Sequence, residues 1–309
     1  MTRIPSARPI LMSALVLNVI SFVSVGGAIN AAEPNSESKI SVMLVDGQNN
    51  HDWLRCGPVM IHTLEATGRF EVEQFSVTKE DIPDFKPDFT RFDVVLSNYN
   101  GKPWLEETKT AFVKYIREGG NLVVVHAADN SFPNWKEFNK MIGLGGWGGR
   151  NEKDGPYVYW KDGKVVRDDS PGRGGSHGRA WTYKVVVRNT DHPITRGLPT
   201  EFLQVKEELY DRLRGPGENM EILATGLAKG GSERDEPVLM TIKYGKGRVF
   251  HTVMGHDHKS MQGIAFQETL IRGTEWAATG KVTFPPVSEK DLPADEAIYR
   301  DPKDIKPIQ

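Results

Sequence analysis

Cysteine is almost absent from this sequence, and neither sign of charge is in excess. Cys56 is the one cysteine among 309 residues, which excludes an internal disulfide framework, a cysteine-based zinc finger and an iron–sulfur cluster. Lysine and arginine number 39 against 41 aspartates and glutamates, a net charge of −2. Nucleic-acid-binding proteins normally carry a basic surplus, so this balance argues against nucleic acid as a partner. The chemistry must therefore come from histidine, carboxylates, and arginine or lysine.

Residues 1–32 have the layout of an export signal. Arg3 and Arg8 precede an apolar run at 10–25, and small residues follow at 26–32. This order is typical of a secretory signal peptide, and the run is short for a membrane span of about 20 residues. An uncleaved membrane anchor is the alternative. Because no other long apolar stretch occurs, we expect a periplasmic or secreted protein with no stable membrane insertion after signal removal.

Strand and helix patterns alternate through the first half of the remaining chain. The predicted strands are 39–45, 70–76, 92–97 and 121–125. The predicted helices are 56–66 and 106–118, the second ending at Gly119-Gly120. Strands that are apolar throughout indicate a parallel sheet covered on both faces. The sequence therefore predicts an α/β fold around a mostly parallel sheet, over residues 39–280.

Two stretches depart from this pattern. Residues 143–180 hold eleven glycines, and only 157–160 has strand character, so we expect a long insert that is functional or disordered. Residues 281–309 form a tail rich in proline and aspartate, expected to lie over the surface. Between these stretches we predict strands at 182–187 and 221–224, a hairpin of 238–244 with 248–253, and a closing helix at 264–278.

Histidines follow three of the predicted strands. His51 comes after the first strand, His126 after 121–125, and His256 after 248–253. In open parallel sheets, ligands bind beyond the carboxyl ends of the strands, so we expect these imidazoles to meet at one rim. Each also has a plain interpretation as a turn or surface residue. His177 lies in a glycine loop from which it could approach a ligand, whereas His251, within a strand, is expected to be structural.

Several motifs in order along the chain resemble the ThuA-like (trehalose utilisation) family. They are Val125-His126-Ala127-Ala128-Asp129, a loop with His177, the segment 191–198, Glu207-Glu208-Leu209-Tyr210, and 244–250 leading into Gly255-His256. The resemblance covers about residues 39–280. It implies a class I glutamine amidotransferase-like fold, a flavodoxin-like three-layer sandwich with a mostly parallel sheet. It also implies a role in the uptake and breakdown of sugars.

The resemblance does not imply glutaminase chemistry. In the amidotransferase relatives, a nucleophilic cysteine occupies the sharp turn after the strand equivalent to 121–125. This sequence has His126 at that turn, and Cys56 lies in the first predicted helix. Without the thiolate, the usual covalent mechanism is not available.

Imidazoles at this rim, with one carboxylate, predict a metal centre. Neutral histidines and a carboxylate suit Zn²⁺ or a related divalent ion, and three protein ligands with an open position would activate water. We expect His51, His126 and His256 as ligands, with Glu208 as a further ligand or acid–base partner. His126, Glu208 and His177 are the expected catalytic residues, with His177 closing over the substrate. No local metal-binding signature such as H-E-x-x-H supports this assignment.

A small saccharide is the expected partner. Aromatic faces can stack on a sugar ring, while amides and carboxylates bind its hydroxyls. The residues expected to contact it are Asn50, Trp53, Asn98, Asp129, Trp147 and Tyr210. These features predict an exported protein that acts on a sugar or keto-sugar derivative by metal-assisted or His/Glu acid–base chemistry, as a hydrolase, lyase or isomerase. A non-catalytic sugar-binding or accessory module is the alternative.

Overall fold

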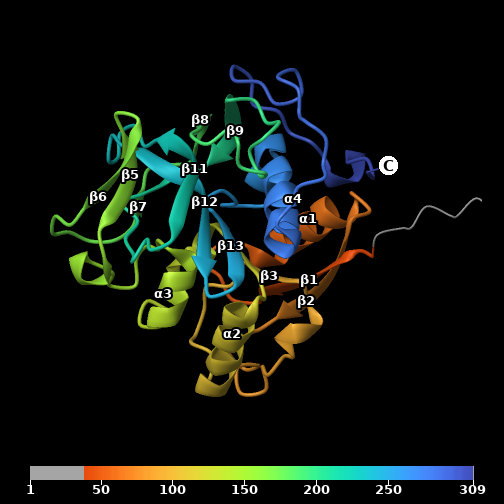
Figure 1. Cartoon of the computed structure of the whole chain (residues 1–309), viewed down its shortest axis with the longest axis vertical. Helices are drawn as coiled ribbons and strands as arrows, with labels where there is room; N and C mark the ends of the chain where they lie inside the picture. The colour runs from red at the N-terminus through yellow and green to blue at the C-terminus, as the bar shows by residue number, and fades with distance from the viewer. Residues whose placement is uncertain (1–37, 309) are drawn as a thin grey trace, which may run out of the picture. The chain divides into compact units, whose positions relative to one another are not determined.

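An eleven-stranded mixed sheet forms the centre of the computed structural model, which describes residues 38–308 (Figure 1). The expected export signal, residues 1–32, lies outside the described residues. Five neighbouring strands are parallel. In spatial order they are β2 (Phe70–Ser76), β1 (Ile40–Asp46), β3 (Val94–Ser97), β4 (Leu122–Val125) and β13 (Gly247–Thr252). The predicted parallel strands are therefore confirmed, with their carboxyl ends at one edge.

Beyond β13 the sheet continues with antiparallel pairs. The next strands are β12 (Asp235–Tyr244), β11 (Met220–Leu227), β8 (Trp181–Val187) and β9 (Glu201–Glu207). The β12–β13 hairpin is as predicted. Four alternations of direction make β9 run the same way as β13, so the end of β9 also points toward the edge where the parallel strands end.

Helices cover both faces of the sheet, which confirms a mixed α/β architecture (Figure 1). On one face α1 (Trp53–Glu65) packs against α4 (Ile264–Thr279), and α2 (Glu106–Glu118) and α3 (Lys136–Ile142) lie on the other. Helix α1 begins three residues before its predicted start because the carboxylate of Asp52 accepts a hydrogen bond from the amide of Arg55 and caps it. Within residues 38–308 no helix has the length and apolar character that crossing a bilayer requires.

The continuous apolar strands form the core, as their sequences predicted. Residues Val94–Leu96 of β3 and Leu122–Val125 of β4 have no solvent-exposed surface. Burying each such side chain contributes about 1.5–3 kcal/mol. These two central strands are therefore fixed in place by packing on both faces, and the residues that follow them are held correspondingly firmly.

The glycine-rich insert is more regular than predicted. It contains the hairpin β5 (Tyr157–Lys161) and β6 (Lys164–Asp168), attached to β12, and the short strand β7 (Ser176–His177). Strand β7 pairs with β10 (Tyr210–Asp211) in a separate two-stranded ribbon. The fully buried Arg214 stacks 3.5 Å from the ring centre of Tyr157 and donates to the carbonyls of Gly155 and Ser170. The insert is therefore ordered in the structure, and its expected functional role stays a prediction.

The C-terminal segment lies along α4 and β9, in agreement with the expected surface tail. The amide of Leu203 donates to the carbonyl of Pro293, and that of Ile264 to Ile298. Leu292 is only 2% exposed. Because the tail covers its outer side, α4 is buried along most of its length.

Candidate functional site

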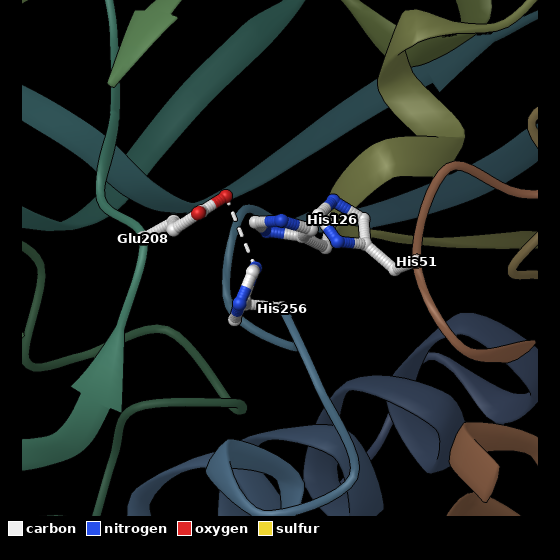
Figure 2. Close-up of side chains that lie close together, drawn as sticks. All are labelled: His51, His126, Glu208 and His256. Atoms are coloured by element: carbon white, nitrogen blue, oxygen red, sulfur yellow. Dashed lines mark ion pairs between the residues drawn. The ribbon is translucent and has the colours of Figure 1, made fainter. Parts of the chain in front are cut away.

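Three histidines and one glutamate meet at the edge where the parallel strands end (Figure 2). His51 lies between β1 and α1, His126 directly follows β4, and His256 follows β13. Glu208 comes directly after β9. One ligand atom from each of the four lies within 4.8 Å of the others. The structure thus brings together the three predicted metal ligands and the predicted acid–base residue.

His126 is oriented by the backbone around it. Its φ of 46° lies in the left-handed region, so the chain turns sharply at the end of β4. Its Nδ1 donates a 2.6 Å hydrogen bond to the carbonyl of Val253, and its Nε2 is buried with no partner. Burial first, and then the nearby His51, hold the pKa of His126 well below its usual value. The imidazole is therefore neutral, with the lone pair of Nε2 free for a ligand.

His51 is also neutral. Burial, together with the neighbouring His256, lowers the pKa of His51 to about 4. Its ring centre lies 4.9 Å from that of His126 and 4.7 Å from that of His256. Its Nε2 lies 3.0 Å from Nδ2 of Asn50 and 3.5 Å from the hydroxyl of Tyr210. Two uncharged imidazoles thus stand beside each other at the centre of the cluster.

His256 and Glu208 supply the charge. Oε2 of Glu208 lies 3.0 Å from Nδ1 of His256. Burial opposes the charged form of His256, but Glu208 outweighs it and raises the histidine pKa. Burial likewise opposes the carboxylate, yet His256 holds the pKa of Glu208 below its usual value. His256 and Glu208 therefore stabilise each other's charged forms, and a metal cation could take the place of the proton on His256.

Glu207 stabilises the backbone on both sides of this pair. The side chain of Glu207 is fully buried. Its carboxylate accepts hydrogen bonds from the amides of Gly255 (2.7 Å), His256 (3.0 Å) and Glu208 (2.9 Å). The turn that carries His256 is therefore bound directly to the end of β9.

Tyr210 and Trp147 form an aromatic surface beside the cluster. The ring centre of Tyr210 lies 4.1 Å from that of His126 and 4.7 Å from that of Trp147. His177 is paired through β7 with Tyr210, and its Nε2 lies 3.7 Å from Oε2 of Glu208. Burial raises the pKa of Tyr210 well above its usual value, so its hydroxyl remains a donor. The predicted residues Trp147, His177 and Tyr210 therefore lie together at the site.

Three other residues predicted to contact the substrate have different surroundings. They are Asn50, Asn98 and Trp53. Asn50 bridges His51 and Asn100, and its Oδ1 accepts from Asn100 at 2.7 Å. Asn98 is 3% exposed, and its Nδ2 is buried with no hydrogen-bond partner. Trp53 is half-buried at the start of α1. Asn50 thus contacts the cluster through His51, whereas the Oδ1 of Asn98 accepts a hydrogen bond from Asn49.

Asp129 lies in the short helix that begins at His126. Its side chain is fully buried, and its Oδ2 lies 3.3 Å from Nε2 of His251, whose Nδ1 donates to the carbonyl of Ile142. Its Oδ1 is buried with no hydrogen-bond partner. Asp129 is thus held by His251, and its contact with a substrate stays a prediction. The structural role expected for His251 fits this buried pair.

Arg150 was missed by the sequence interpretation. It is 3% exposed and donates to the carbonyls of Asn130, Ser131 and Gly146. It thereby ties the insert, which carries Trp147, to the turn that carries His126. The sequence shows only that Arg150 lies in a glycine-rich segment. It does not indicate which backbone carbonyls the guanidinium contacts.

Comparisons with known proteins give consistent results. The sequence profile of the ThuA family, described as trehalose utilisation, matches residues 41–277. A crystal structure of a ThuA-like protein from Parabacteroides merdae is 45% identical, has a TM-score of 0.83, and covers 86% of this chain and 99% of its own. A second ThuA-like protein, from Bacteroides uniformis, is 17% identical with a TM-score of 0.56, over 82% of this chain and 98% of its own. No match is found among curated proteins.

Proposed function

Since the chain belongs to the ThuA (trehalose utilisation) family, we propose that it is a metal-dependent enzyme of carbohydrate metabolism whose centre is the four-residue cluster. Membership suggests a role related to trehalose utilisation. The proposed ligands of the cation are His51, His126 and His256. Zn²⁺ fits this donor set best, because three imidazoles leave a coordination position open for substrate.

One observation carries the proposal: Nε2 of His126 is buried and unpaired, close to three other ligand atoms. Leaving a buried polar atom without a partner costs about 1–3 kcal/mol. A metal ion would supply the missing partner. The hydrogen bond from Nδ1 to Val253 is the kind of contact that orients a metal-binding histidine and fixes its tautomer.

The residues around the cation would divide the remaining work. A divalent ion at this position supplies Lewis acidity that polarises a substrate oxygen or water. Glu208, at the rim, would take up and return a proton at Oε2. His177, whose Nε2 lies 3.7 Å from that oxygen, would transfer the proton between Glu208 and the substrate. The hydroxyl of Tyr210 would donate a hydrogen bond to the bound molecule.

The proposed substrate is a saccharide or keto-sugar derivative, and the reaction a hydrolysis, elimination or isomerisation. Support comes from the residues beside the cluster: Trp147 and Tyr210 offer aromatic surface, while Asn50 offers an amide. We also propose that residues 1–32 direct export, so that the protein acts in the periplasm or outside the cell, as a soluble protein without nucleic-acid partners.

Elemental analysis tests the metal centre. The purified protein is expected to retain close to one equivalent of a divalent metal after dialysis. His126→Ala should reduce this to background, whereas His62→Ala, which alters an exposed histidine of α1, should leave it unchanged. Equal metal content in both variants would refute the assignment of His126.

Turnover assays test the catalytic role. Disaccharides and their keto derivatives should be consumed by the metal-loaded protein, and at least a hundredfold more slowly by Glu208→Gln, since general acid–base catalysis contributes about 10²–10⁴. A thermal shift with sugar but no turnover would instead favour the sugar-binding accessory module.

A further inference from the structure

A second cavity lies on the opposite side of the β7–β10 ribbon from the histidine cluster. It has a volume of about 370 Å³ and is lined by residues that follow β7, by β10, and by the turn after β11. Along β10 successive side chains point to opposite faces. Tyr210 therefore faces His126, while its neighbours Leu209 and Asp211 line this cavity. The volume lies within the range of small-ligand sites.

Asp211 provides an unsatisfied acceptor in the wall of the cavity. The residue is 1% exposed. Its Oδ2 accepts from the amide of Ser232 at 2.7 Å and from Nη1 of Arg212 at 3.1 Å. Its Oδ1 is buried and has no hydrogen-bond partner. Because an unpaired buried carboxylate oxygen is costly, a ligand hydroxyl at this position would be bound favourably.

The other lining side chains indicate the chemistry of such a ligand. Trp181 is half-buried and offers an aromatic face. Arg179 and Lys229 are exposed at the cavity and bring two positive charges against the single negative charge of Asp211. An aromatic face, a hydroxyl acceptor and surplus positive charge together suit a hydroxylated ring that carries an anionic group.

We propose that this cavity binds a sugar unit with an anionic substituent. The ring packs on Trp181, a hydroxyl donates to Oδ1 of Asp211, and the anionic group contacts Arg179 and Lys229. This site is independent of the metal centre, because the two lie on opposite faces of the ribbon. The cavity and the metal centre share the β7–β10 ribbon, which carries Tyr210 and His177. The cavity therefore adds a second carbohydrate-binding site beside the proposed active site.

Calorimetric titration of the purified protein with sodium glucuronate, glucose 6-phosphate and glucose tests the proposal. At low salt, at least one of the two anionic sugars is expected to bind at least tenfold more tightly than glucose, and 0.5 M NaCl should reduce the difference. Tighter binding of glucuronate would identify the anionic group as a carboxylate, and tighter binding of glucose 6-phosphate would identify it as a phosphate. Anionic sugars that bind no better than glucose would overturn the proposal.

Variants locate the binding. Trp181→Ala and Asp211→Asn should each weaken it at least tenfold, and Arg179→Gln, at an exposed position that leaves the fold intact, should remove most of the preference for the anion. His126→Ala should bind the anionic sugar as tightly as the unaltered protein. Loss of binding in His126→Ala, or unchanged preference in Arg179→Gln, would place the ligand elsewhere and overturn the assignment.

Discussion

His126 has a backbone conformation that few non-glycine residues adopt, with φ at 46°. Such conformations cost about 1–3 kcal/mol and persist where the surrounding structure determines them. Here β4 fixes the residue on one side, and the hydrogen bond to Val253 fixes the ring on the other. This strained backbone conformation directs the imidazole of His126 into the centre of the cluster. An unstrained turn would direct the imidazole elsewhere.

At the same scale, Glu207 is predicted to hold the site together. In Glu207→Ala the amides of Gly255, His256 and Glu208 lose their acceptor. Since each buried unpaired group costs about 1–3 kcal/mol, the free energy of unfolding should fall by at least about 3 kcal/mol. Urea denaturation measures this. Glu201→Ala, at the exposed start of β9, serves as control and should cost under about 1 kcal/mol.

The sequence predicted the histidines of the site better than their supports. His51, His126 and His256 each follow a strand that an apolar run makes visible, and parallel strands end at one edge. The role of Glu207 could not be predicted in this way, because it depends on β9 lying next to the turn after β13. The burial of Asp129 likewise depends on His251, which is distant in the sequence.

At the scale of elements, the turn between β13 and the following helix has no room for a side chain. Gly255 has φ of 112°, and a Cβ there would lie 2.7 Å from Cγ1 of Val125 and 3.0 Å from Phe266. Gly255→Ala should therefore displace the turn and with it His256. Gly230 also has a positive φ, but open space around it, so Gly230→Ala measures the backbone cost alone.

We expect Gly255→Ala to lower the free energy of unfolding by about 1–3 kcal/mol more than Gly230→Ala does, and to reduce bound metal. Denaturation and elemental analysis of both variants check this. Equal stability and equal metal content in the two variants would show that the contact with Val125 does not position His256.

The start of β12 carries a buried acid whose effect should depend on pH. Burial raises the pKa of Glu236 to about 7, although Ser232 and the amide of Arg212 partly oppose the rise. The folded state therefore binds this proton more tightly than the unfolded state, and its contribution to stability is lost as pH rises from about 4.5 toward 7.

Glu236→Gln should remove this dependence, since its carbonyl oxygen can still accept from Ser232 and Arg212. At pH 5 the variant and the unaltered protein should be similarly stable. At pH 8 the variant should be more stable, by up to about 3 kcal/mol. Urea denaturation at both pH values checks the sign, and a parallel decline of both proteins would contradict it.

Elements were predicted where their sequences are regular. β2 and α2 have the predicted bounds, whereas β9 was missed because its alternation includes the buried polar residues Gln204 and Glu207. The order of the insert escaped prediction for a similar reason. It depends on the contacts of Arg150 and Arg214 with distant backbone carbonyls, and glycine content alone cannot reveal such contacts.

At the scale of the whole molecule, the C-terminal segment completes the packing around α4. Leu292 is 2% exposed, and Leu54 is 67% exposed. Leu292→Ala should lower the free energy of unfolding by about 2–5 kcal/mol, while Leu54→Ala should change it by less than about 0.5 kcal/mol. Thermal and urea denaturation of the pair check this. Similar effects of both changes would mean that the tail contributes little to stability.

The four side chains of the cluster come from both ends of the described chain and from its middle. His51 follows the first strand, and His256 the last. In a nascent chain the cluster is therefore incomplete until synthesis and folding are nearly finished. Under the proposed export and metal binding, a protein that completes its folding outside the cytoplasm would take its ion from the metals available there, whatever the cytoplasmic pool contains.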